Sequence, residues 1–327
     1  MKVLRGFAGI ELGDAGTVVS IGNFDGVHIG HQAVIGSAVR AARQRELMSV
    51  VCTFDPHTRV FLRPDAPPRL LETLAQRLGA IETLGVDVAV VIPFDKAVAA
   101  LPREEFVTDF LCRALGTVEL HVSQAFTFGA GGKGNVEYLE TIAAEHGFGV
   151  QVVGSVMSGG GTVSSSRIRD ALEAGRVAAA AALLGRPFSL VGTIVAGAGR
   201  GRGLGAPTAN LAVENTFTPG RGVYVTEARV AGVAYPAITN VGVRPTFEDD
   251  GELTVETHLL DHRASLYGEP MELAFRKKLR DEARFESADA LAAQIAEDVR
   301  QAVEWTANAN ENVRYNADVS PRVPAGE

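Results

Sequence analysis

The sequence predicts two domains: a doubly wound parallel α/β domain, followed by a small antiparallel β-barrel with a C-terminal helix. Its 327 residues exceed the size of one ordinary domain, so two domains are expected. In the first half, β-branched segments alternate with segments of helical periodicity. After Gly185-Arg186-Pro187 the chain becomes dense in Gly and β-branched residues, in short segments separated by turn signals.

Composition narrows the class of protein. Apolar residues make up 46% and charged residues 21% of the chain, as in globular domains with real cores. The apolar stretches are too short for a transmembrane helix, and the N-terminal residues lack the apolar run of a secretory signal. Cys52 and Cys112 form neither a disulfide framework nor a metal-ligand pattern, which favours a reducing compartment. We therefore expect a cytoplasmic protein.

The net charge of the chain indicates which classes of binding partner to expect. A net charge of −8 argues against binding nucleic acid through a broad basic surface. We expect neither a nucleic acid nor a membrane as partner, and the sequence does not give the oligomeric state.

The first half contains five predicted strands joined by four predicted helices. The strands are expected at 17–21, 49–54, 86–92, 118–122 and 149–153. The helices are expected at 28–45, 70–84, 104–115 and 136–146. Strands joined through helices of this length pair in parallel through right-handed crossovers. The near-continuous apolar strands fit a sheet covered on both faces, with ligands at the carboxyl ends of its strands.

The second half contains short strands that fit a small barrel. They are expected at 191–197, 222–230, 232–242, 253–261 and 271–279, followed by a helix at 288–306. The polar residues from 308 onward contain scattered Pro and Gly and are expected to be disordered. The predicted domains are therefore 1–185 and 186–307, with a tail at 308–327.

The segment GNFDGVHIGH, from Gly22 to His31, lies between the first strand and the first long helix. A helix N-terminus offers free N–H groups and the positive end of the helix dipole, so it binds anions. Glycines let a ligand approach the backbone closely. His28 and His31 are three residues apart, so they share a helix face and can donate to one phosphate chain. No Lys completes a G-x-x-x-x-G-K pattern, which excludes a Walker-type loop.

These residue types suggest attack of an acceptor on the α-phosphate of ATP, with both histidines stabilising charge on the departing pyrophosphate. An ordinary strand-turn-helix with two surface histidines is the alternative interpretation. The segment fits G-x-F-D-x-x-H-x-G-H at every fixed position, and in this it resembles the nucleotidylyltransferase superfamily. The motif does not identify the acceptor, because cytidylyl- and adenylyltransferases share it.

A second candidate phosphate site opens the helix after the fifth strand. Three hydroxyls, at Ser164, Ser165 and Ser166, precede Arg167 and Arg169. Hydroxyls, helix N–H groups and arginines together suit the phosphates of ATP. A Ser N-cap followed by exposed arginines is the alternative interpretation.

The barrel half begins with a Gly-rich basic segment, AGAGRGRGLGAPTANL at 196–211. Its glycines, with Arg200 and Arg202, can wrap triphosphate oxygens. Thr208 and Asn210 are two residues apart, so in an extended segment they share a face and can meet a hard Mg²⁺ ion. A long surface loop is the alternative interpretation.

Glu256 lies in the strand-like run VETH, in which it shares a face with His258. A carboxylate in this position is a candidate base for a substrate hydroxyl. Taken singly, a solvated strand carboxylate is the simpler interpretation.

The order of motifs in the barrel half resembles the bacterial riboflavin kinase domain. After the Gly-rich segment come LGAPTAN at 204–210, GVY at 222–224, NVGVRPTF at 240–247, VETHLLD at 255–261, LYG at 266–268 and LRDEARF at 279–285. In the first half, FDPH at 54–57 and VSSSRIR at 163–169 resemble the FAD synthetase module. The chain is thus similar, over about residues 15 to 306, to the bifunctional riboflavin kinase/FAD synthetase family.

The resemblance implies a reaction sequence and a set of site residues. Riboflavin and ATP give FMN, and FMN and ATP give FAD and pyrophosphate, both with Mg²⁺. Glu256 is implied as the base that activates the ribityl hydroxyl, with Thr208 and Asn210 as ligands of Mg²⁺ and ATP. His28 and His31 are implied as catalytic residues of the first domain. The other residues expected around nucleotide and flavin are Gly22, Asn23, Phe24, Asp25, Gly30, Ser164, Ser165, Arg169, Gly199, Arg200, Gly205, Arg280, Glu282 and Phe285.

One segment, Val122 to Gly134, departs from the family pattern V-G-x-N/D-F-x-F-G-x-x-R-x-G. Here Ser123 replaces Gly, Ala125 replaces the polar residue and Gly132 replaces Arg. Lys133 supplies a charge but not the bidentate fork of an arginine. Losing a polar group that holds the flavin or phosphate costs on the order of 1–3 kcal/mol.

Three functions therefore compete. The leading one is the bifunctional enzyme. The second is a riboflavin kinase whose adenylyltransferase domain is weakened or altered in substrate. The third is a non-catalytic flavin-binding protein, against which Thr208, Asn210 and Glu256 argue, because a binder needs no base.

Overall fold

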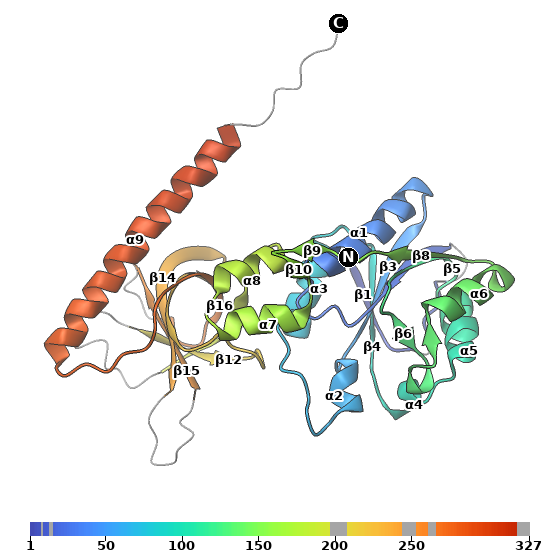
Figure 1. The fold of residues 1–327 in the computed structure, drawn as a ribbon, viewed down its shortest axis with the longest axis horizontal. Helices are drawn as coiled ribbons and strands as arrows, with labels where there is room; N and C mark the ends of the chain where they lie inside the picture. Colours follow the sequence, from blue (N-terminus) through green and yellow to red (C-terminus); the bar gives the residue numbers. More distant parts are fainter. Residues whose placement is uncertain (8, 13–15, 197–207, 244–252, 261–265, 319–327) are drawn as a thin grey trace, which may run out of the picture. The chain divides into compact units, whose positions relative to one another are not determined.

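The computed structural model describes residues 1–7, 9–12, 16–196, 208–243, 253–260 and 266–318 (Figure 1). The chain divides into two compact units. The first comprises Met1–Arg169 and Ala182–Arg186, and the second comprises Asp170–Ala181 and Pro187–Glu327. Arg186, which precedes the proline at the junction, belongs to the first unit.

The first unit is built on a parallel sheet of six strands in the order β1-β4-β3-β2-β5-β8. The strands are β1 (Lys2–Arg5), β2 (Thr17–Ile21), β3 (Met48–Phe54), β4 (Val88–Ile92), β5 (Thr117–Ser123) and β8 (Gly149–Val153). The five predicted strands and their parallel pairing are confirmed. The sequence did not predict β1, because this short edge strand is largely exposed and carries no apolar run.

Helices cover both faces of this sheet, and the side chains of each strand divide between them. Val18 of β2 packs toward α1 (Ile29–Gln44), whereas Val19 packs against the opposite helices, including Leu139 of α6 (Val136–His146). Successive side chains of a strand point to opposite faces, so the near-continuous apolar strands are explained by burial on both sides. The doubly wound α/β prediction is confirmed.

Two predicted helices differ from the observed ones. The helix expected at 70–84 is α3 (Leu74–Glu82), because Thr73 caps it in a capping box with Gln76. The segment expected as one helix at 104–115 is a short α5 (Arg103–Glu105) followed by a π-helix at Phe106–Ala114. Apolar spacing does not distinguish these wider turns from α-helical ones.

Several short elements complete the first unit, and two helices lie where the chain passes to the second. The short elements are α2 (Thr58–Leu62), α4 (Lys96–Ala99), the hairpin of β6 (Thr127–Phe128) and β7 (Gly134–Asn135), a 3-10 turn at Ala130–Gly132, and the hairpin of β9 (Met157–Ser158) and β10 (Gly161–Thr162). The two helices are α7 (Ser165–Glu173) and α8 (Val177–Leu184).

The second unit contains a closed antiparallel barrel in the order β11-β12-β15-β14-β13-β16. Its strands are β11 (Ser189–Val195), β12 (Ala209–Val213), β13 (Gly222–Val230), β14 (Val233–Val243), β15 (Leu253–Leu259) and β16 (Pro270–Arg280). Inward residues alternate with outward ones, as Val255 and Thr257 are buried on either side of the half-buried Glu256. The barrel prediction is confirmed.

The barrel interior contains a polar chain as well as apolar side chains. The hydroxyls of Thr226, Thr239 and Thr257 are hydrogen bonded in series, at 2.7 and 3.0 Å. All three side chains are buried, so each hydroxyl satisfies the next in a place that water does not reach.

The C-terminal helix α9 (Ala288–Asp318) packs on the barrel through Ala302 and the barrel residues Val223 and Val225. The helix was predicted to end at Thr306, whereas α9 extends to Asp318, and the disorder predicted from residue 308 stays a prediction. The segment contains neither Gly nor Pro before Pro321, so nothing in it breaks the helix. Residues 319–327 of the predicted tail lie outside the described residues.

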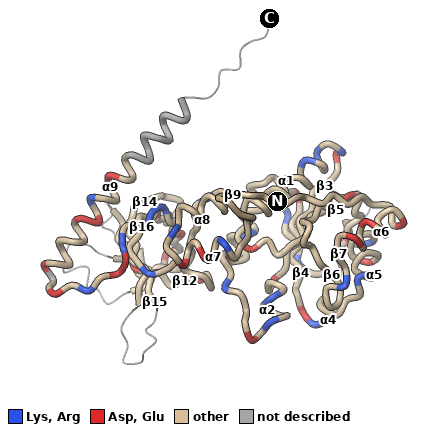
Figure 2. Tube along the Cα trace, viewed as in Figure 1, with Lys and Arg blue, Asp and Glu red and all other residues tan. Residues whose placement is uncertain are grey.

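Charged residues lie along the described turns of α9 (Figure 2). Arg300 forms ion pairs with Glu297 and Glu304, one turn away on either side. Among the helices that the structure describes, none is both long and apolar enough to cross a membrane.

We expect Gly192→Ala to destabilise the barrel by several kcal/mol, because a Cβ there would overlap the carbonyl oxygen of Ala212 on β12. Trp305 is the sole tryptophan and packs against the barrel, so its fluorescence follows the unfolding of this unit. Gly79→Ala is the matched control, since a Cβ at Gly79 in α3 meets nothing within 4 Å. A Gly192→Ala variant with an unchanged urea midpoint by Trp305 fluorescence would contradict the expectation.

Candidate active sites

The first cavity lies at the carboxyl ends of the central strands of the parallel sheet. It has a volume of about 490 Å³. Its walls include Asn23 after β2, His57 after β3 and Ser123 at the end of β5. The chain passes from β2 to β3 on one side and later returns to β5 on the other side of β2. The cavity therefore lies at the switch point where doubly wound sheets bind ligands.

The turn between β2 and α1 has an uncommon backbone. Phe24 and Val27 have positive φ angles of 51° and 33°, and Gly26 has a φ of 85°. Positive φ is unfavourable for residues with a Cβ, above all for a β-branched residue such as Val27. A backbone of this kind persists only where its surroundings hold it, and it is common at functional sites.

His28 and His31 are brought together by this turn. His28 is the N-cap of α1, and its Nδ1 accepts a hydrogen bond from the backbone N–H of His31 at 3.2 Å. The two imidazole rings stack with centroids 3.6 Å apart. Because Nδ1 of His28 accepts, the proton of the neutral ring lies on Nε2, which is then a donor. Within the described residues, Nδ1 of His31 is buried without a hydrogen-bond partner.

His31 and His57 line the cavity, whereas His28 stacks on His31 and is not among the lining residues. All three histidines are held neutral. Burial lowers the pKa of His28 and of His57 from 6.5 to about 4. Burial, together with His28, Arg77 and His57, lowers the pKa of His31 well below its usual value. His57 is also a helix N-cap, since its Nδ1 accepts from the backbone N–H of Arg59 at 3.1 Å. All three rings therefore offer neutral donors and acceptors at neutral pH.

Two motif glycines allow side chains to approach the backbone closely. A Cβ at Gly22 would lie 2.9 Å from the ring of Phe24, and one at Gly30 would lie 3.1 Å from the ring of His28. Phe24 in turn meets His31 edge to face, with centroids 5.3 Å apart. The glycines thus leave room for the packed rings that position the histidines.

The polar residues of the same turn bind other parts of the protein. The side-chain amide of Asn23 donates to Oγ1 of Thr58 at 3.0 Å and accepts from its backbone N–H at 3.0 Å. Asp25 is buried; it accepts from the N–H of Leu71 at 2.9 Å and forms an ion pair with Arg169. Asn23 and Asp25 therefore fix the loops that follow β3 and precede α3.

The serine segment lies beside this turn. The Ser165 hydroxyl donates to the backbone oxygen of Asp25 at 2.9 Å and lines the cavity. The Ser164 hydroxyl accepts from the N–H of Arg167 at 3.3 Å, as a helix cap does. Arg167 points away and donates to backbone oxygens of the β9–β10 hairpin, among them Gly161 at 2.7 Å. Of the predicted phosphate clamp, only Ser165 is among the cavity-lining residues.

The three departures from the family pattern, Ser123, Ala125 and Gly132, all line this cavity. Phe126 and Phe128 of the same segment line it as well, and their rings stack with centroids 5.5 Å apart. This part of the lining is largely aromatic and apolar, whereas the turn after β2 brings His31 and polar side chains to the same cavity. The lining therefore combines groups suited to phosphates with groups suited to a planar ring system.

Sequence reasoning missed Arg77, which lies in the middle of α3. It is 1% exposed and donates to Oγ1 of Thr53 at 3.1 Å and to the backbone oxygen of Phe54 at 2.9 Å. The carboxylates of Asp25 and Glu72 stabilise its charge. Its helical spacing is that of an ordinary core position, so only its charge could have drawn attention to it.

The second cavity lies on the outer face of the barrel, between the strands and α9. It has a volume of about 410 Å³. Thr208 and Glu256 line it with Asn240 and His258, while Leu291 and Ile295 contribute from α9. Glu256 is paired in register with Asn210 on one side and with Asn240 on the other. Cross-strand partners share a face, so the three side chains form one polar row.

This cavity is also lined by the three residues that were predicted to lie near the flavin, Arg280, Glu282 and Phe285. Arg280 forms a bidentate ion pair with the buried Asp298 of α9, with nitrogen–oxygen distances of 2.8 to 3.2 Å. Its guanidinium also lies over the ring of Phe285, 5.6 Å from the centroid. Sequence reasoning missed Asp298, because a single acidic residue on an amphipathic helix resembles a solvated one.

Four residues predicted to contact the nucleotide lie outside the described residues: Gly199, Arg200, Arg202 and Gly205. Thr208, at the end of the same segment, is described and lines the second cavity.

A strained turn with a packed histidine pair at the switch point of a parallel sheet, together with a carboxylate in a barrel cavity, is the arrangement of a two-domain nucleotide-dependent transferase. The family model of FAD synthetase matches residues 11–167, and that of riboflavin kinase matches residues 184–306. The chain belongs to the bifunctional riboflavin kinase/FMN adenylyltransferase family. The predicted family is thereby confirmed.

Relatives match over nearly the whole chain. The bifunctional riboflavin kinase/FMN adenylyltransferase of Escherichia coli (strain K12) is 37% identical over 93% of this chain and 98% of that protein. That of Bacillus subtilis (strain 168) is 33% identical over 90% of this chain and 94% of that protein. A crystal structure of a macrolide-efflux protein from Streptococcus pneumoniae superposes with a TM-score of 0.85 at 30% identity, covering 93% of this chain and 100% of that one.

We expect the free energy of unfolding to fall as the pH decreases from about 6.5 to about 4, the pKa values of the unfolded and folded His28 and His57. In this window the unfolded chain binds protons at these rings and the folded chain does not, so acid favours unfolding. Each pKa unit of difference corresponds to about 1.4 kcal/mol.

Asparagine also caps helices but does not titrate, so the double variant His28→Asn/His57→Asn isolates the histidine contribution from that of the carboxylates. Urea unfolding followed by circular dichroism at a series of pH values measures it. The variant should show a smaller loss of stability with acid, and an equal loss would contradict the assignment.

Proposed function

We propose that the α/β cavity is where FMN is adenylylated to FAD and that the barrel cavity is where riboflavin is phosphorylated to FMN, each step using ATP. The observation that carries the proposal is the gathering of each motif at its own cavity, with the histidine turn at one and Glu256 at the other. The adenylyltransferase occupies residues 1–185 and the kinase residues 186–307. We place the enzyme in the cytoplasm, where its free cysteines, Cys52 and Cys112, stay reduced.

In the adenylyl transfer, a phosphate oxygen of FMN attacks the α-phosphorus of ATP, and the bond to pyrophosphate breaks. Neutral His28 donates from Nε2, and His31 beside it donates to the same leaving phosphates, where negative charge accumulates. Ser165, whose hydroxyl lines the cavity, and the first turn of α1 add polar contacts to the phosphates. The aromatic wall of Phe126 and Phe128 receives the flavin.

In the phosphoryl transfer, Glu256 accepts the proton of the ribityl 5′-hydroxyl as that oxygen attacks the γ-phosphorus of ATP and ADP leaves. The carboxylate lines the cavity from the outer face of β15, between the two asparagines paired with it. The apolar walls from Val223, Ile238 and Ile295 receive the flavin ring. Arg280 and Phe285 form the end of the same cavity.

The residues around Glu256 fit Mg²⁺. Thr208, Asn210 and Glu256 offer hydroxyl, amide and carboxylate oxygens, which are the hard ligands that this ion prefers. When bound, Mg²⁺ neutralises charge on the phosphates of ATP. Thr208 and Asn210 are its proposed ligands.

The two alternative functions are not favoured. Both domain models match, and the relatives carry names that include both activities. A riboflavin kinase with a weakened or altered first domain would need Glu256 but no intact histidine pair, whereas a non-catalytic flavin-binding protein would need neither.

Glu256→Gln should abolish FMN formation from riboflavin while leaving FAD formation from supplied FMN intact. Removing a general base lowers a rate by about 10²–10⁴-fold, and the two cavities are built from different residues. Incubation with riboflavin or FMN, ATP and Mg²⁺, followed by chromatography, measures both rates. His28→Ala/His31→Ala is the reciprocal variant, expected to lose FAD formation and keep the kinase. If Glu256→Gln phosphorylates riboflavin at the wild-type rate, Glu256 is not the base.

Ala125→Asn should lower the KM for FMN in adenylyl transfer by about tenfold and leave the KM for ATP nearly unchanged, since one hydrogen bond contributes about 1 kcal/mol or more. The reason is that Ala125 lines the cavity next to Phe126, in a segment separate from the histidine turn, and is exposed, so an amide has room there. Steady-state kinetics with each substrate varied in turn make the comparison. Should FMN bind no better, the acceptor is held by other residues of this cavity.

A further inference from the structure

Arg186 lies at the junction between the two units and reaches the strained turn of the first cavity. It precedes Pro187 in sequence and belongs to the first unit. Its Nη2 donates to the backbone oxygen of Gly26 at 2.9 Å, and its Nη1 donates to that of Val27 at 3.2 Å. Two successive carbonyl groups of the positive-φ turn are thus held by one guanidinium.

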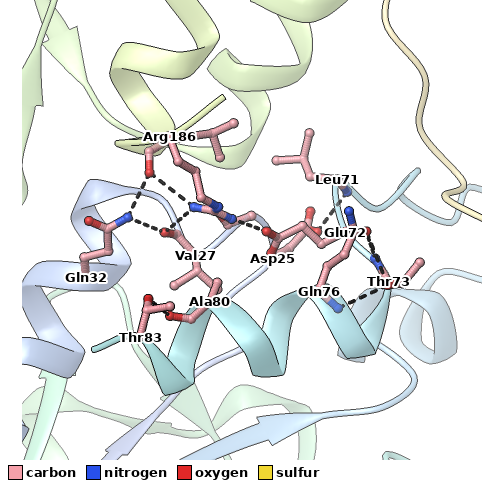
Figure 3. A network of polar contacts seen from close by, with 12 residues as sticks. Asp25, Val27, Gln32, Leu71, Glu72, Thr73, Gln76, Ala80, Thr83 and Arg186 are labelled. Carbon is pink, nitrogen blue, oxygen red and sulfur yellow. Dashed lines mark hydrogen bonds and ion pairs between the residues drawn. The ribbon is translucent and has the colours of Figure 1, made fainter. Parts of the chain in front are cut away.

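The guanidinium is itself fixed from the other side. Figure 3 shows it between Val27 and the carboxylate of Glu72, with which Nη2 forms an ion pair. Glu72 is 8% exposed and precedes α3, whereas the Arg186 side chain is 32% exposed, so the pair is shielded from water on its carboxylate side. A planar fork that meets two carbonyls and a carboxylate in fixed geometry is specific to arginine, because a lysine ammonium has no such shape.

Gln32 closes the network from α1. Its Nε2 donates to the backbone oxygens of Val27 and Leu184, both at 2.8 Å, and Leu184 also accepts from Arg186 at 3.3 Å (Figure 3). Val27 therefore accepts two hydrogen bonds at a φ of 33°, where its backbone is otherwise unfavourable. The next residue is His28, whose ring caps α1 and stacks on His31.

From this geometry we propose that Arg186 is a positioning residue for adenylyl transfer, which holds the Gly26–Val27 turn and thereby aims His28 and His31 at the departing phosphates. Like His28, Arg186 and Glu72 are not among the residues that line the cavity, whereas Asp25 and His31 are. Because the guanidinium is held by Gly26, Val27 and Glu72, we assign it an action through the turn and not on the substrate. The proposal rests on the function proposed above for this cavity.

Arg186 also contributes a charge. The titratable and charged groups that face His28 are His31 on α1 and Arg186 at the junction, and those that face His31 are His28, Arg77 of α3 and His57. After burial, the positive charge of Arg186 is among the causes that lower the pKa of His28. Removing the charge of Arg186 therefore raises the pKa of His28. A variant without that charge thus shows the electrostatic effect of Arg186 separately from its geometric effect.

The test uses the full chain with Arg186→Lys, Arg186→Ala and, as matched control, Arg113→Lys, which changes an exposed ion pair with Asp109. We expect the kcat of FAD formation to fall about tenfold in Arg186→Lys and about a hundredfold in Arg186→Ala, since small misplacements of reacting groups have effects of this size. Riboflavin phosphorylation by the same preparations, and both activities of Arg113→Lys, should stay at the wild-type level.

The pH profile distinguishes positioning from a general structural role, because an inactive fraction lowers a rate without moving its pH midpoint. In Arg186→Ala the acid limb of kcat for FAD formation should move to higher pH, and in Arg186→Lys it should stay in place. Wild-type kcat in both variants, or an equal loss of both activities with unmoved acid limbs, would overturn the proposal. If the unaltered chain makes no FAD from FMN and ATP, the proposed function of the cavity fails instead.

Discussion

The central position of β2 in the parallel sheet determines where the cavity of the first unit lies. Every residue of β2 is buried, and the strand lies between β3 and β5. Parallel pairing on both sides aligns the carboxyl ends of the three strands at one edge. Asn23, His57 and Ser123, far apart in sequence, therefore surround one cavity. The turn that leaves β2 must bend away at once into α1, which explains why its backbone takes positive φ angles.

The second unit obtains its cavity by a different physical route. The interior of its closed barrel holds buried side chains, among them the threonines whose hydroxyls are bonded in series. The cavity lies instead between the outward face of β15 and α9. The buried ion pair of Arg280 with Asp298 joins a strand to this helix, which makes α9 a wall of the site as well as a cover for the barrel.

Much of this architecture could be predicted from sequence, and the failures have physical reasons. Strand positions followed from buried β-branched runs, and the histidine turn followed from its place between strand and helix. The edge strand β1 was missed because it is largely exposed, and the length of α9 was underestimated because a helix does not require an apolar face at its end. Ion pairs such as that of Arg186 with Glu72 could not be predicted, because the two residues are far apart in the sequence. Arg169 was expected on ATP, whereas the fold pairs it with Asp25.

The neutrality of the buried histidines has a consequence for how the first cavity recognises a triphosphate. His28, His31 and His57 carry donors without charge, and the charges of Arg169 and Arg186 are balanced by carboxylates within the fold. Of the residues that line the cavity, Arg59 is the one cation, so the proposed binding of ATP depends largely on short, directional contacts. Such contacts are little affected by ionic strength, whereas an open cluster of cations loses its hold on phosphate as counterions accumulate. On the proposed function, shape and donor placement select the nucleotide, and pyrophosphate leaves without a cluster of cations to retain it.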